Sequence, residues 1–135
     1  MKPTLAEGIS GVREVVVDRD RTIDFMGEDV RVYATPMLVK DIETTCRELL
    51  LAHLDPGEDS VGTRVEIDHL APTLLGMNVH IEARVAELKG RAVTFEVAAR
   101  DPLDAICRCR HSRFIVDVSQ TAKRLAAKAQ KAKGA

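Results

Sequence analysis

One segment of the chain, Thr35 to Leu54, has the apolar spacing of a long helix and narrows the folds open to this sequence. At about 100° per residue, most of its apolar side chains fall on one continuous arc of the helix surface. Thr35 followed by Pro36 predicts the helix start, with a capping hydroxyl and then proline at the first helical position. Asp55-Pro56-Gly57 predicts the turn that ends it. The arc comprises Leu38, Val39, Ile42, Glu43, Thr45, Cys46, Leu49, Leu50, His53 and Leu54.

The opposite face of this helix carries mostly polar and charged side chains, and we expect solvent there. Its members are Lys40, Asp41, Thr44, Arg47 and Glu48. One arc therefore faces a core and the other faces water, as in an amphipathic helix of a globular protein.

After the helix, apolar and polar residues alternate in segments typical of half-buried strands. Residues 60–71, 78–88, 91–100 and 105–118 form four such segments, joined by short turns. A valine-rich segment at 11–18 predicts another strand before the helix. The polar residues between them predict a loop or flap, followed by a short extended piece at 30–34. In the first segment after the helix, alternation predicts an inner face of Val61, Thr63, Val65, Ile67 and His69.

A sheet of about five mostly antiparallel strands needs a cover for its apolar face, and the chain offers one long apolar helix for it. We therefore predict an α+β domain in which the sheet wraps around this helix. With 135 residues the chain has the length of one domain. We expect the domain to span residues 1–121, followed by a basic helical tail at 122–135.

The overall charge argues against broad electrostatic binding to nucleic acid or a membrane, because 20 basic and 21 acidic residues leave a net charge of −1. Only the tail departs from this balance, with five basic residues and no acidic one. We favour a solvated helix for it over a nucleic-acid arm, and a third reading is that its lysines contact the phosphates of a ligand.

No apolar leader or membrane-spanning stretch is visible, and three cysteines suit a reducing compartment, so we expect a cytoplasmic protein. Cys107 and Cys109 lie two residues apart, on one face of any strand. With His111 they could be drawn as a metal site, but no second ligand cluster accompanies them. We favour small core-facing side chains and predict no metal.

Glu43 stands out because it lies between Leu50 and Leu54 on the apolar arc. A carboxylate in that setting loses hydration and must find partners, unless it bends out to water at the edge of the arc. His69 points toward the same layer from the strand, and Thr35 adds a hydroxyl at the helix start. Each of the three has an ordinary structural explanation. Together they suit activation of a water or hydroxyl group beside an oxyanion site.

The sequence resembles the hotdog-fold acyl-CoA thioesterases, in particular the fluoroacetyl-CoA thioesterase group. The resemblance runs from about Val32 to Val118 and rests on VYATPMLVKDIE, LDPGEDSVGTRVEIDH and HSRFIV. It implies a hotdog fold and a catalytic set of Thr35, Glu43 and His69. It also implies that the backbone of Gly62 helps to hold the thioester. Members of this group are dimers whose sheets join edge to edge, with active sites at the dimer interface, so the resemblance implies a homodimer or a dimer of dimers.

The flap departs from the family pattern. The fluoroacetate-specific enzyme carries paired phenylalanines there, whereas this flap offers Phe25 and Met26 as candidate substrate-binding residues. We further expect Arg113 or the tail lysines to contact the phosphates of coenzyme A, which is part of the substrate, so no separate cofactor is implied.

The resemblance implies hydrolysis of a small acyl-CoA thioester to a carboxylic acid and free coenzyme A. We expect Glu43 to act as the base or as the carboxylate on the side of the nucleophile, and Thr35 to orient water or relay a proton. His69 would carry a proton to the leaving thiolate, and Gly62 would bind the carbonyl oxygen. Two alternatives remain: a hotdog enoyl-CoA hydratase and a non-catalytic acyl-CoA-binding module.

Overall fold

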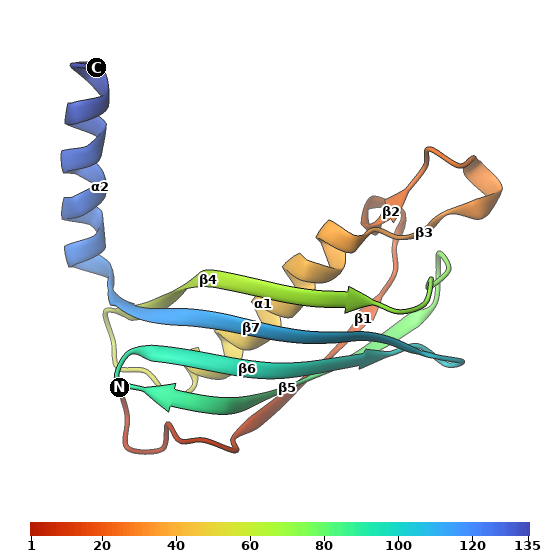
Figure 1. The fold of residues 1–135 in the computed structure, drawn as a ribbon, viewed down its shortest axis with the longest axis horizontal. Coiled ribbons are helices and arrows are strands. Elements are labelled where there is room, and N and C mark those ends of the chain that lie inside the picture. The colour runs from red at the N-terminus through yellow and green to blue at the C-terminus, as the bar shows by residue number, and fades with distance from the viewer.

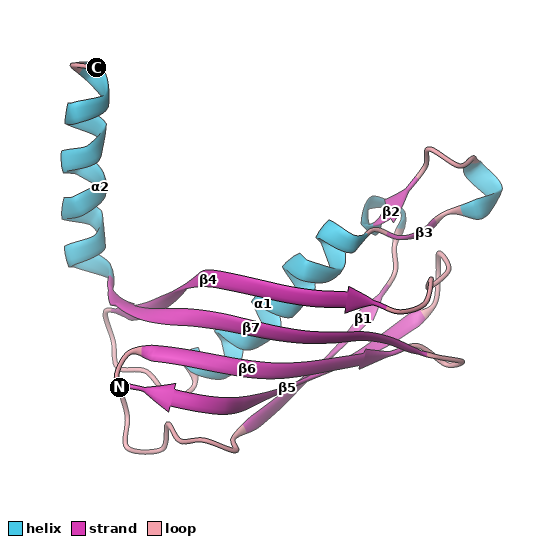
Figure 2. Ribbon diagram, viewed as in Figure 1, coloured by secondary structure: helices cyan, strands magenta, loops and turns pink.

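A five-stranded antiparallel sheet and one long helix form the body of the protein, as the sequence predicts. The structure is a computed structural model that describes residues 1–135. In spatial order the sheet runs β1-β5-β6-β7-β4, and α1 lies across its inner face (Figure 1). The α+β hotdog architecture is confirmed (Figure 2). The elements of the body are β1 (Ser10–Val16), α1 (Thr35–Leu51), β4 (Glu58–His69), β5 (Asn78–Lys89), β6 (Ala92–Arg100) and β7 (Ala105–Asp117).

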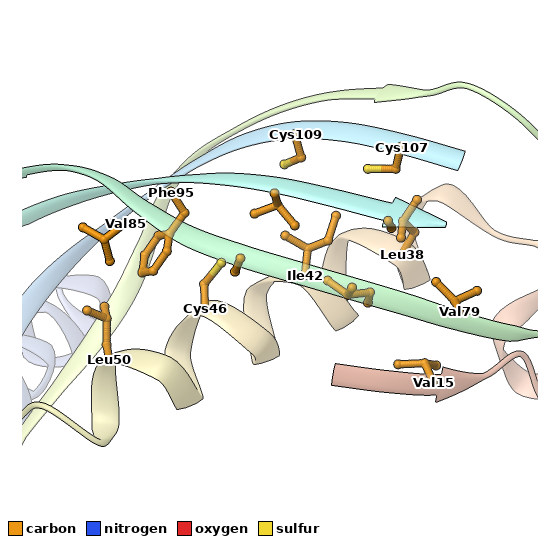
Figure 3. Packing of buried hydrophobic residues seen from close by; sticks show 14 of the residues in the cluster. Val15, Leu38, Ile42, Cys46, Leu50, Val79, Val85, Phe95, Cys107 and Cys109 are labelled. Carbon is orange, nitrogen blue, oxygen red and sulfur yellow. The ribbon is translucent and has the colours of Figure 1, made fainter. Parts of the chain in front are cut away.

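The core forms where the apolar arc of α1 meets the inner face of the sheet (Figure 3). Leu38, Ile42, Cys46 and Leu50 recur at every fourth position of the helix, and all four are fully buried. The inward side chains of β5 and β6 alternate as predicted. Cys107 and Cys109 of β7 are buried in the same core, so the prediction of core-facing cysteines is confirmed.

The polar side of α1 differs from the expectation at one position, Asp41, which is buried. Arg21 donates to it through two nitrogens, at 2.9 and 3.1 Å, and the hydroxyl of Tyr33 donates to it as well. The pKa of the buried Tyr33 hydroxyl is raised by desolvation and by this carboxylate. Because Arg21 precedes β2 and Tyr33 ends β3, this cluster fastens the base of the flap to the helix.

The inner face of β4 also differs from the predicted alternation. The register against β7 shifts between Gly62 and Arg64, so Thr63 is an extra residue in a β-bulge. Ser60 and Gly62 on one side of the bulge, and His69 on the other, all share the inner face. Val61 pairs with the exposed Phe114 and points outward, opposite to the prediction. A regular strand would have put residues 62 and 69 on opposite faces.

The flap is a small two-stranded unit between β1 and α1. Strands β2 (Thr22–Ile23) and β3 (Val32–Tyr33) pair with each other, and two short 3₁₀ turns lie at Arg19–Arg21 and Glu28–Val30. The flap exposes apolar side chains: Phe25 is 79% exposed and Met26 is 55% exposed. Figure 1 shows it extending from the helix start beyond the end of β4.

The last element is helix α2 (Val118–Lys133), which contains most of the basic tail and begins four residues before it. Asp117 caps its start by accepting from the backbone N–H of Gln120. None of its residues is buried, and Figure 1 shows it projecting from the body. Neither α1 nor α2 combines the length and apolar character that a helical membrane crossing needs.

Candidate active site

Thr35 and His69 meet where the start of α1 faces the end of β4. The Oγ1 atom of Thr35 lies 2.7 Å from Nδ1 of His69. Thr35 is the first helical residue, and its hydroxyl makes no cap. Ala34 occupies the cap position instead, so the predicted capping role is wrong. The helix therefore directs this hydroxyl to the imidazole.

The other ring nitrogen of His69, Nε2, is buried and has no hydrogen-bond partner. Buried polar atoms in folded proteins are nearly always paired, so an orphaned one points to a missing ligand or a chemical role. Burial lowers the pKa of His69 and keeps the ring neutral near pH 7. If the Thr35 hydroxyl donates to Nδ1, then Nε2 carries the proton and is ready to donate it.

A cavity of about 470 Å³ opens beside this pair. Its walls are apolar apart from Thr35, His69 and Tyr33, and it contains no Lys, Arg, Asp or Glu. Phe25 reaches it from the flap, whereas Met26 does not line it. The lining residues are Ile23, Phe25, Val32, Tyr33, Ala34, Thr35, Pro36, His69, Leu70, Ala71 and Pro72. Such a cavity suits an uncharged, largely apolar group.

Glu43 lies in a second cluster, two helical turns farther along α1. Its Oε2 atom accepts from Nη1 of Arg113 at 3.3 Å, and its side chain is 40% exposed. Gly62 of β4 packs directly against it. A β-carbon added at Gly62 would stand 2.5 Å from Oε2 of Glu43, so no larger residue fits without moving the carboxylate. The carboxylate on the apolar arc has therefore found a partner and keeps one side open.

Arg113 is only 5% exposed in its side chain, and its guanidinium is held on several sides. It donates from Nε to the hydroxyl of Ser60 at 2.7 Å and from Nη2 to the Ser60 carbonyl at 2.9 Å. Its Nη1 also lies 3.2 Å from Nε2 of His111. Arg113 thus points into the protein toward Glu43, and its predicted contact with substrate stays a prediction.

His111 fixes the orientation of this arginine. Its Nδ1 lies 2.7 Å from the carbonyl oxygen of Arg64, so Nδ1 carries the proton and Nε2 accepts from Arg113. Burial, together with the charge of Arg113, lowers the pKa of His111. From the sequence we considered His111 only as a metal ligand and did not predict its contact with Arg113. The spacing in HSR, which puts His111 and Arg113 on one face of a strand, was the available signal.

The expected meeting of Thr35, Glu43 and His69 is thus divided between two clusters within one chain. Thr35 and Glu43 are eight residues apart on α1, which corresponds to about 12 Å along the helix axis. One cluster offers a hydroxyl and an imidazole, and the other offers a carboxylate, a guanidinium and a closely packed backbone at Gly62. The first suits proton delivery and the second suits proton abstraction beside a polarised carbonyl.

The outer face of the sheet carries a larger hollow, of about 590 Å³, that contains no residue of either cluster. It is lined mainly by alternating acidic and basic side chains, among them Glu66, Asp68, Glu96, Arg108 and Arg110. Several of these pair with each other, for example Arg110 with Glu96. We interpret this face as a solvated ladder of charges.

The sequence matches the family model described as fluoroacetyl-CoA-specific thioesterase over residues 17–119. A curated relative, the fluoroacetyl-CoA thioesterase of Streptantibioticus cattleyicolor, is 28% identical over 127 residues. The alignment covers 89% of this chain and 91% of the relative.

Solved structures give the same picture. A hypothetical protein of Thermus thermophilus, described as a thioesterase superfamily member, superimposes with a TM-score of 0.89 at 30% identity, over 98% of this chain and 99% of the other. The fluoroacetyl-CoA thioesterase FlK superimposes with a TM-score of 0.84 at 26% identity, over 92% and 97%. A variant of FlK in complex with fluoroacetate and CoA gives 0.80 at 27% identity, over 87% and 99%.

Proposed function

The chain belongs to the fluoroacetyl-CoA-specific thioesterase family and is an acyl-CoA thioesterase, and we propose that it cleaves a small acyl-CoA with Thr35, Glu43 and His69. The observation that carries this proposal is the buried, unpartnered Nε2 of His69. It lies in a ring whose other nitrogen contacts Thr35, beside an apolar cavity. An acyl group in the cavity would bring its thioester to that nitrogen.

We further propose that the working enzyme is a homodimer joined through β4. This strand lies at the edge of the sheet, is twelve residues long and exposes Val61 and Val65. A long edge strand presents a row of unpaired backbone N–H and C=O groups and is prone to pair with another chain. Two-fold pairing of β4 with its copy runs antiparallel, so the Glu58 end of one strand lies beside the His69 end of the other.

This pairing also explains the division of the site. Within one chain, seven residues of β4 separate Gly62 from His69, about 23 Å along an extended strand. If the pairing is centred, with Glu58 of one strand opposite the last residue of the other, Gly62 and the Glu43 beside it lie opposite position 65 of the partner strand. That leaves about 13 Å along the strand to His69 of the partner subunit. A thioester between the two clusters would then meet Glu43 from one protomer and His69 from the other.

The proposed reaction is hydrolysis by an activated water. Glu43 takes a proton from water as the water oxygen bonds to the carbonyl carbon. The carbonyl oxygen gains negative charge, which the backbone N–H of Gly62 stabilises. When the intermediate collapses, the carbon–sulfur bond breaks, the thiolate of CoA takes the proton from Nε2 of His69, and the proton that Glu43 took from water returns to the ring. Thr35 holds the ring in the tautomer that has this proton.

The lining of the cavity supports a proposal about the class of acyl group. Because its lining holds no cationic or anionic side chain, we expect uncharged acyl groups to be accepted and carboxylated ones to be excluded. Fluoroacetyl-CoA belongs among the candidates, since the curated relative carries that name.

The test is release of free thiol from a panel of acyl-CoAs by the wild type, Glu43→Gln and Glu48→Gln. Glu48 is an exposed residue of the same helix, paired with Arg13, and serves as the matched control. We expect Glu43→Gln to lose about 10²-fold or more in kcat while its far-ultraviolet circular dichroism spectrum stays unchanged. Glu48→Gln should have the kcat of the wild type. Near-normal rates for Glu43→Gln on every accepted thioester would overturn the site. Consumption of crotonyl-CoA without thiol release would identify a hydratase, and tight binding without turnover would identify a binding module.

A further inference from the structure

Helix α2 carries an uncompensated positive charge. Its cations are Lys123, Arg124, Lys128, Lys131 and Lys133, and no acidic residue occurs between Val118 and Ala135. None of the five takes part in an ion pair of the structure. Arg124, Lys128 and Lys131 recur at helical spacing, so they form a row along one side of α2. The rest of the chain carries a net negative charge.

The position of α2 places this row of cations beside the open edge of the sheet. The backbone N–H of Val118 donates to the carbonyl of Gly57 at 2.9 Å, so α2 starts beside the first residue of β4. Figure 1 shows α2 rising past β4, beyond the open edge of the sheet. The helix therefore lies outside its own domain, on the side where a second copy would pair.

The cavity beside Thr35 and His69, by contrast, lacks positive charge. Coenzyme A carries a diphosphate and a 3′-phosphate, which require cations, yet no Lys or Arg lines this cavity. Arg113, which the sequence predicts to contact these phosphates, is buried, and its nitrogens already contact Glu43, Ser60 and His111. The chain's own pocket thus accounts for an acyl group and leaves the charged end of the substrate without a partner.

Antiparallel pairing of β4 with its copy joins these two observations. The start of β4 in one protomer lies beside the end of β4 in the other, and α2 begins at the start while the Thr35–His69 cavity opens at the end. We propose that α2 of one protomer lies at the mouth of the partner's cavity and binds the phosphates of coenzyme A there. This inference rests on the proposed function and adds a subsite formed in trans.

The first test separates the phosphates from the acyl group. Kinetics are measured for one accepted acyl-CoA and for the same acyl group on pantetheine, which lacks the nucleotide and its phosphates. For Arg124→Gln/Lys128→Gln we expect KM for the acyl-CoA to rise about tenfold or more, with kcat unchanged and with unchanged kinetics on acyl-pantetheine. The control Lys2→Gln/Lys89→Gln removes the same charge from exposed sites elsewhere and should match the wild type.

A loss shared equally by both substrates, or no loss in either, would overturn the subsite. So would an effect of the control variant equal to that of the α2 variant. If the wild type cleaves neither substrate, the proposed function fails instead, and the two failures are therefore distinguishable. Binding of single-stranded DNA that weakens in the α2 variant, with KM for acyl-CoA unchanged, would assign α2 to nucleic acid.

The second test asks which protomer supplies the charges. Mixed dimers are purified with two affinity tags so that only one subunit has His69 and the other carries His69→Ala. When Arg124→Gln/Lys128→Gln lies on the subunit that keeps His69, the partner's intact α2 serves the working cavity and KM should be normal. When Arg124→Gln/Lys128→Gln lies on the subunit that carries His69→Ala, the working cavity faces the altered α2 and KM should rise. The reverse pattern would show that α2 acts within its own chain and would overturn the proposal.

Discussion

Gly62 lies so close to Glu43 that a β-carbon on the glycine would stand 2.5 Å from the Oε2 atom of the carboxylate. No unusual backbone angle demands glycine at this position, because the φ angle of Gly62 is not in the positive region. The requirement comes from the carboxylate, which Arg113 holds on its other side. Strand β4 and helix α1 thus meet at a polar contact in which the glycine leaves room for the carboxylate.

Gly62→Ala should therefore displace Glu43. We expect kcat/KM to fall about tenfold or more and the free energy of unfolding to fall by about 1–3 kcal/mol, the usual range for overpacking. Thiol-release kinetics and urea unfolding measure the two effects. Gly11→Ala is the matched control, since Gly11 is another strand glycine without a positive φ and its β-carbon would meet the flexible Leu49. If adding Glu43→Ala to Gly62→Ala restores none of the lost stability, the close contact is not the cause.

Thr35→Ser should keep most activity, whereas Thr35→Val should lose most of it. Serine retains the hydroxyl that lies 2.7 Å from Nδ1 of His69, and valine has the same shape as threonine without it. In the proposed mechanism the hydroxyl fixes the ring tautomer, so we expect the valine variant to lose about 10²-fold in kcat with little change in KM. Steady-state kinetics on the best acyl-CoA decide this. Equal rates for the two variants would remove the hydroxyl from the mechanism.

Stability should fall as the pH falls below about 6.5, the usual pKa of histidine. Burial lowers the pKa of both His69 and His111 in the folded state. The unfolded chain then binds protons before the folded one does, so this contribution is complete above pH 6.5 and is lost on acidification. Each histidine adds at most about 1.4 kcal/mol per pH unit. Urea unfolding between pH 8 and pH 5.5 gives the free energy of unfolding at each pH. This free energy should fall less steeply with falling pH for His111→Gln than for the wild type. An identical pH dependence would contradict a lowered pKa for His111.

The three cysteines should be inert in the folded protein. Burial raises the pKa of Cys46 and Cys107 to about 12 and that of Cys109 to about 11. Because the thiolate is the reactive form, a thiol reagent such as DTNB at pH 8 should label none of them on the time scale at which it labels all three in urea. Rapid labelling of any one in the native protein would show that the core opens there.

The sequence by itself determined the fold class and most of the elements. Apolar residues recur at every fourth position in α1 and at every second position in β5, β6 and β7. A sheet wrapped on one helix buries both patterns. These periods are local properties of the chain, so the helix over Thr35–Leu51 and the strands after it were predictable within a few residues. The polar residues of interest, Thr35, Glu43 and His69, could also be named because each interrupts or ends such a pattern.

The tertiary structure alone decided which of these residues meet. The bulge at Thr63 reverses the alternation of β4, which puts Gly62 and His69 on one face and turns Val61 outward. Asp41 is buried because Arg21 and Tyr33, distant in the sequence, surround it. Glu43 lies with Arg113 and not with His69 because eight residues of helix separate it from Thr35. Periodicity fixes which face a residue takes, but contact between elements depends on register, bulges and long-range partners, which no local pattern encodes.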